Sequence, residues 1–124
     1  MFGIFGRSQE MQALDRALRG AGLTPRGIPE AVKLTTLKQL KESNFGRSPD
    51  AQALAQAADL IAYCLLGSEE FRQTNGASRA ESVEARLGDA LETGYGLDAR
   101  LVLLTLHAGL IDPGLIKRYN LSSE

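Results

Sequence analysis

Residues 48–67 constrain the fold more than any other stretch of this chain. They read S-P-D-A-Q-A-L-A-Q-A-A-D-L-I-A-Y-C-L-L-G, with a helix-start signal at Ser48 and Pro49 and a helix-ending glycine at Gly67. At about 100° per residue, apolar side chains cover most sides of this helix. A helix that is apolar on most sides is buried on most sides. We therefore expect residues 49–66 to form the central buried helix of an all-α domain.

The remaining sequence also favours helices. Leu occurs 20 times and Ala 16 times, against 5 Ile and 3 Val, and unbranched side chains suit helices better than strands. Helix-start signals recur along the chain, at Ser8, Pro29, Ser48, Ser68, the capping box of Ser78 with Glu81, Asp98 and Asp112. These signals predict a compact single-domain bundle of six to seven short helices over residues 1–124. Residues 1–7 would form an apolar arm and residues 120–124 a frayed tail.

The central helix carries one thin polar line, formed by Gln52, Gln56, Asp59 and Tyr63. The line is interpreted either as a narrow solvent-facing stripe, or as the floor of a ligand groove or a self-association seam. Two flanks of small residues predict that neighbouring helices approach closely. They are Ala53, Ala57 and Cys64 on one side, and Ala51, Ala55, Ala58 and Ala62 on the other. Leucine at Ala55 or Ala58 is therefore expected to overpack the core.

Charge is divided unevenly along the chain. Residues 16–47 carry a balance of +5 and residues 48–98 a balance of −6, although the net charge is −1. The candidate basic contact consists of Arg26, Lys33, Lys38, Lys41 and Arg47. It is either a solvated face, on which long lysine stems reach water, or a contact for phosphate or an acidic partner. The acidic half of another copy is one such partner.

The N-terminal arm is a candidate apolar contact through Phe2, Ile4 and Phe5. These side chains either pack against the core or present an apolar surface to a partner or a membrane surface. The arm lacks the pattern of a signal peptide, and no apolar run reaches the ~20 residues that span a bilayer. With a single cysteine excluding an internal disulfide, we expect a cytoplasmic protein without a membrane span.

No set of residues carries recognisable chemistry. The only histidine, His107, and the only cysteine, Cys64, fall on different helices, whereas a metal site needs several ligands at fixed spacing. The paired glycines follow helices, not strands, so they do not form a phosphate loop. We therefore expect neither a metal nor a cofactor, and we assign no catalytic residue. No family resemblance is found.

Three hypotheses about function follow. The first is a non-enzymatic helical protein-interaction module that binds a protein partner or itself. The second is a nucleic-acid-binding protein that uses the basic segment 16–47, although the linker between its two helices is longer than that of a helix-turn-helix. The third is a small-ligand binder or enzyme that uses the polar line of the central helix.

Overall fold

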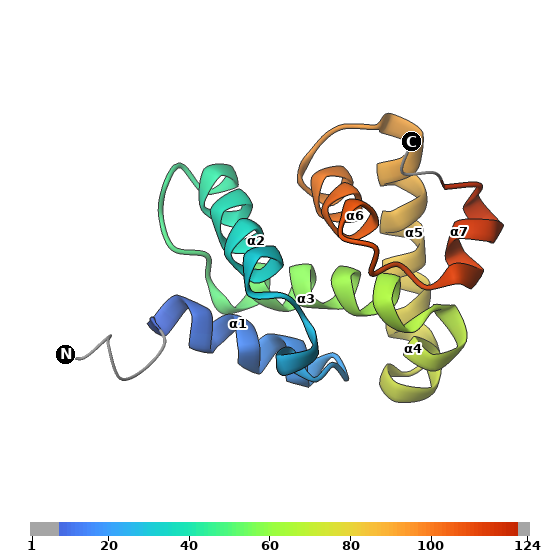
Figure 1. Cartoon of the computed structure of the whole chain (residues 1–124), viewed down its shortest axis with the longest axis horizontal. Helices are drawn as coiled ribbons and strands as arrows, with labels where there is room; N and C mark the ends of the chain where they lie inside the picture. Colours follow the sequence, from blue (N-terminus) through green and yellow to red (C-terminus); the bar gives the residue numbers. More distant parts are fainter. Residues whose placement is uncertain (1–7, 122–124) are drawn as a thin grey trace.

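The computed structural model describes residues 8–121, and over that range it is all-α, as expected (Figure 1). A single 3₁₀ turn, η1, covers Pro25–Gly27. The helices are α1 (Gln9–Gly20), α2 (Glu30–Ser43), α3 (Ala51–Leu66), α4 (Ser68–Asn75), α5 (Ala77–Thr93), α6 (Leu97–His107) and α7 (Pro113–Tyr119). The expected arm with Phe2, Ile4 and Phe5, and residues 122–124 of the expected tail, lie outside the described residues.

Helix α3 is central, which confirms the prediction for residues 49–66. It contacts α1, α2, α4, α5 and α6, and Figure 1 shows it running through the middle of the molecule. Leu60, Ile61 and Leu54 are buried along it, together with Ala58 and Ala62. The apolar circumference of this one helix is thus what the other helices pack against.

The second small-residue flank is only half buried. Ala58 and Ala62 lie in the core, but Ala51 and Ala55 are exposed in the first turns of α3. The expectation that leucine overpacks at residue 55 is therefore wrong. Ala51 and Ala55 lie in the first turns of α3 on a side that the other described helices leave uncovered, whereas Leu54 in the same turns is buried.

Several predicted helix starts differ in detail. Asp50, not Ser48, caps α3, because its Oδ1 accepts a 2.8 Å hydrogen bond from the Ala53 amide, while the Ser48 hydroxyl donates to Glu10. The capping box at Ser78 does not form, since α5 already begins at Ala77. Asp98 lies inside the first turn of α6. It binds Arg86 of α5 instead, with N–O distances of 2.9 and 3.1 Å.

Helix α6 lies between α2 and α5 and contacts both (Figure 1). Arg100 near the start of α6 donates to the Ser43 hydroxyl at the end of α2, at 3.1 Å. The outer sides of α2 and α5 therefore belong to opposite flanks of α6. Within residues 8–121, none of the helices is both long and apolar enough to cross a membrane.

Candidate functional site

The polar line of α3 divides into an exposed half and a half that faces α5. Gln52 and Gln56 are exposed. Asp59 forms a two-pronged ion pair with Arg79 of α5, at 2.6 and 3.1 Å. Tyr63 is fully buried, and its hydroxyl donates a 2.7 Å hydrogen bond to Glu84 of α5. The second half of the line is thus engaged within the chain.

Tyr63 and Glu84 form a polar junction inside the bundle. Burial, and then the hydrogen bond to Glu84, raise the pKa of the phenol well above its usual range. The pKa of Glu84 is lowered, first by the hydrogen bond from Tyr63 and further by Arg118, 3.1 Å away. The Tyr63 ring packs edge-on against Phe71 at 5.5 Å between centroids. This network joins α3, α4, α5 and α7.

The basic candidates do not share one environment. Arg26, Lys38 and Arg47 are exposed, and Lys41 is half-buried in an ion pair of 3.2 Å with Glu10. Lys33 is only 4% exposed. Its stem does not reach water as long lysine stems often do, because the side chain turns inward between α1 and α2.

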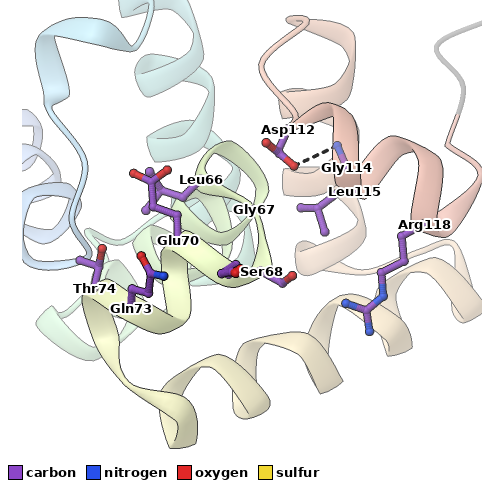
Figure 2. Close-up of a pocket in the computed structure, with 11 residues that line it drawn as sticks. Leu66, Gly67, Ser68, Glu70, Gln73, Thr74, Asp112, Gly114, Leu115 and Arg118 are labelled. Carbon is purple, nitrogen blue, oxygen red and sulfur yellow. Dashed lines mark hydrogen bonds between the residues drawn. The ribbon is translucent and has the colours of Figure 1, made fainter.

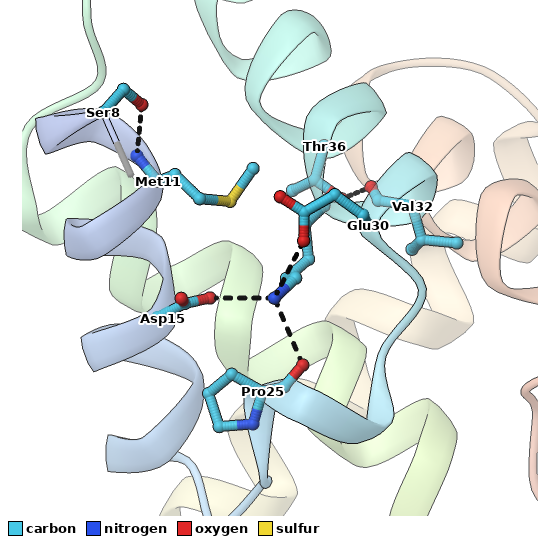
Figure 3. A network of polar contacts seen from close by, with 8 residues as sticks. Ser8, Met11, Asp15, Pro25, Glu30, Val32 and Thr36 are labelled. Carbon is cyan, nitrogen blue, oxygen red and sulfur yellow. Dashed lines mark hydrogen bonds and ion pairs between the residues drawn. The ribbon is translucent and has the colours of Figure 1, made fainter. Parts of the chain in front are cut away.

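Lys33 is one of the residues that line a cavity between α1, η1 and the start of α2. Figure 3 marks the contacts of its ammonium with the labelled Asp15, Pro25 and Glu30. The ammonium donates to Oδ1 of Asp15 and to the carbonyl oxygen of Pro25, each at 3.2 Å. The carboxylate of Glu30 lies 3.6 Å away. The cavity has a volume of about 790 Å³, and Arg19 and Arg26 also line it.

A groove of about 360 Å³ lies between the start of α1 and α2. It is lined by Ser8 and Glu10 on the α1 side and by Leu34, Leu37, Lys38, Lys41, Glu42 and Gly46 on the α2 side. Phe45, next to Gly46, is 89% exposed and has a φ of 58°. We call Leu34, Lys38, Phe45 and Arg47 together the α2 face. Sequence reasoning missed Phe45, although an aromatic residue between Asn44 and Gly46, past a helix end, is a readable signal.

The outer side of α5 has the opposite charge. Glu81, Asp89 and Glu92 are exposed and, at helical spacing, lie on one side with the exposed Ala85 between them. Within residues 8–121 none of these three carboxylates forms an ion pair. We call these four residues the α5 face. The sequence showed the acidic balance of this region, but not which acids stay unpaired.

A further cavity, of about 690 Å³, lies between α4 and α7 (Figure 2). The Asp112 carboxylate accepts from the Gly114 amide at 2.9 Å, and the Asp112 amide donates to the Cys64 carbonyl at 2.8 Å. A Cβ atom at Gly67, where φ is +89°, would lie 2.9 Å from Oδ2 of Asp112. Asp112 therefore holds the start of α7 against the end of α3, and we assign this cavity no ligand.

The remaining reactive side chains are separated. Cys64 is buried, and burial raises its pKa to about 11, so the thiol stays protonated at neutral pH. His107 is exposed in the last turn of α6. Among residues 8–121, no three His, Cys, Asp or Glu side chains are grouped so that they could hold a metal ion.

Comparison of this chain with protein-family models, with curated proteins and with solved structures gave no match.

Proposed function

We propose that this protein is a non-enzymatic interaction module that assembles copies of itself, the α2 face of one copy binding the α5 face of the next. The observation that carries the proposal is Phe45. A bulky non-glycine residue with positive φ costs roughly 1–2 kcal/mol in the left-handed region, and an exposed aromatic ring recovers nothing from burial. Strained residues of this kind cluster at functional sites, and for an exposed ring the corresponding function is contact with another molecule.

The other residues of the α2 face indicate which kind of surface would bind it. Leu34 adds apolar surface, and Lys38 and Arg47 add two cations that form no ion pair within residues 8–121. An apolar centre with cations at its edge fits a protein surface that is apolar in the middle and acidic around it.

The α5 face has that character. Ala85 provides a small apolar centre, and Glu81, Asp89 and Glu92 surround it with negative charge. Because α6 separates the two faces, one copy can offer both at once (Figure 1). Such a contact is heterologous, so it builds rings or open chains of copies instead of closing a two-fold dimer.

Sedimentation velocity over a range of protein concentrations tests the proposal. We expect the sedimentation coefficient to rise with concentration. The rise should diminish between about 0.1 M and 1 M salt, as the Debye length falls from about 10 Å to about 3 Å. A protein that stays monomeric at all concentrations in low salt would overturn the proposal.

Paired variants make the test specific. Lys38→Glu with Arg47→Glu removes the basic partner, and Glu81→Lys with Glu92→Lys removes the acidic one. Each double variant should be monomeric alone, because both of its faces then carry charge of the same sign. A 1:1 mixture should assemble, because one intact α2 face meets one intact α5 face and the two reversed faces are again complementary in charge. Two monomers in the mixture would contradict the head-to-tail contact. Glu69→Lys with Glu70→Lys, the same charge change at exposed residues of α4, should assemble like the parent.

A further inference from the structure

We propose that the cavity between α1, η1 and the start of α2 binds a small anion with carboxylate or phosphate groups. Three cationic residues line this cavity, the buried Lys33 and the exposed Arg19 and Arg26, together with the acidic residues Asp15 and Glu30. The proposal is independent of assembly through the α2 and α5 faces.

The first argument is the incomplete coordination of Lys33. An ammonium group has three N–H donors, and charged pairs usually bind at about 2.7–2.9 Å. Lys33 makes two longer hydrogen bonds, both of 3.2 Å, to Asp15 and to the carbonyl of Pro25. Its third contact, with Glu30, is 3.6 Å, an ion pair without a hydrogen bond. A buried ammonium in such a setting gains from a closer anionic oxygen.

The second argument is the exposure of the Glu30 carboxylate. The Glu30 side chain is 54% exposed, whereas that of Lys33 is 5% exposed, so the carboxylate reaches the ammonium from the solvent side of the cavity (Figure 3). An anionic ligand oxygen can take the place of the Glu30 oxygen, while Asp15 and Pro25 keep their contacts with Lys33. Glu30 would then act as an internal competitor for the ligand.

The third argument is the pair of arginines. Arg19 and Arg26 are exposed at the cavity, and neither guanidinium group forms a hydrogen bond or ion pair within the described part of the chain. The planar guanidinium fork matches carboxylate and phosphate oxygens in pairs. A volume of about 790 Å³ admits a small organic or phosphorylated anion.

Titration with inorganic phosphate and, separately, with citrate tests the site, with amide chemical shifts and the melting temperature as readouts. We expect saturable shifts of the amides in α1, η1 and the start of α2. Arg19→Gln and Arg26→Gln should each weaken the tighter-binding anion by about tenfold, the loss of one charge-assisted contact. Arg72→Gln, at an exposed arginine of α4 outside the cavity and outside the α2 and α5 faces, should bind like the parent.

Glu30→Gln should change the anion affinity in the opposite direction from the arginine variants. Removing the competing carboxylate should strengthen anion binding several-fold, whereas Glu42→Gln, with the same charge change on the exposed side of α2, should leave it unchanged. Phosphate and citrate also stabilise proteins in general, because they are excluded from protein surfaces. Specific binding is therefore judged from the difference between variants in the same salt. Unsaturable shifts with both anions, or equal effects of Glu30→Gln and Glu42→Gln, would overturn the proposal.

Discussion

Oε2 of Glu84 accepts a 2.7 Å hydrogen bond from the hydroxyl of Tyr63, and Nη1 of Arg118 binds the same oxygen at 3.1 Å. Tyr63 belongs to α3, Glu84 to α5 and Arg118 to α7. One carboxylate thus connects the central helix α3 with α5 and α7. The polar line of α3 ends at this junction, where its last member is paired inside the fold.

Tyr63→Phe should lower the free energy of unfolding by about 1.5–3 kcal/mol, the usual contribution of a hydrogen bond to a charged group. The Phe ring retains the packing against Phe71, so the loss of stability measures the contribution of the hydroxyl alone. Chemical denaturation of both proteins measures it. Tyr95→Phe, at an exposed tyrosine, should match the parent, and an equally stable Tyr63→Phe protein would show that the hydrogen bond is not formed.

The same carboxylate predicts a pH dependence. Because the pKa of Glu84 is lower in the folded protein than its ordinary value of 4.5, folding is favoured when the group is ionised. This stability is present above pH 4.5 and is lost as the pH falls through the folded pKa. Glu84→Gln should therefore lose less stability than the parent below that pH. If the free energies of unfolding of the two proteins fall equally with decreasing pH, the prediction is wrong.

Ala58→Leu should overpack the core and cost about 1–3 kcal/mol, because Ala58 is 0% exposed on α3. Ala55→Leu introduces the same side chain three residues earlier, at an exposed position, and should change stability by less than about 0.5 kcal/mol. Thermal melting of the two variants separates these outcomes. Equal melting temperatures would mean that the two alanines share one environment.

Asp15→Ala should cost about 3–5 kcal/mol, because it leaves the Lys33 ammonium buried without its closest carboxylate. The double variant Asp15→Leu with Lys33→Met should recover most of that loss, since apolar side chains of similar size remove both charges. Urea denaturation of the single and double variants measures the coupling. A double variant as unstable as Asp15→Ala would show that the loss does not come from an unpaired buried ammonium.

Phe45→Gly should raise stability by up to about 1 kcal/mol. Glycine adopts a φ of 58° without the steric cost that a side chain carries, and this gain exceeds the extra flexibility of the unfolded chain. Assembly, in contrast, should weaken, because the exposed ring is lost. Calorimetry measures the expected rise in stability, and sedimentation of the same sample measures the expected loss of assembly. A destabilised Phe45→Gly protein would place the ring in a supporting role within the fold.

The sequence by itself determined the all-α architecture, the positions of the helices and the central place of α3. These depend on local information, because a helix start needs a capping residue and a buried helix shows an apolar circumference within about four turns. Asp112 before Pro113 and Ser8 before Gln9 could be read as caps for this reason, and both do cap their helices.

Tertiary structure alone decided the partners of the polar residues. Asp59 pairs with Arg79, Tyr63 with Glu84 and Lys33 with Asp15, across 18 to 21 residues of sequence. Helical spacing shows which residues share one side of a helix but not which helix faces that side. Whether a charge is buried, as for Lys33, or left unpaired, as for Arg19 and Arg26, depends on how the helices pack, since only that packing sets the distance between charges and their access to water.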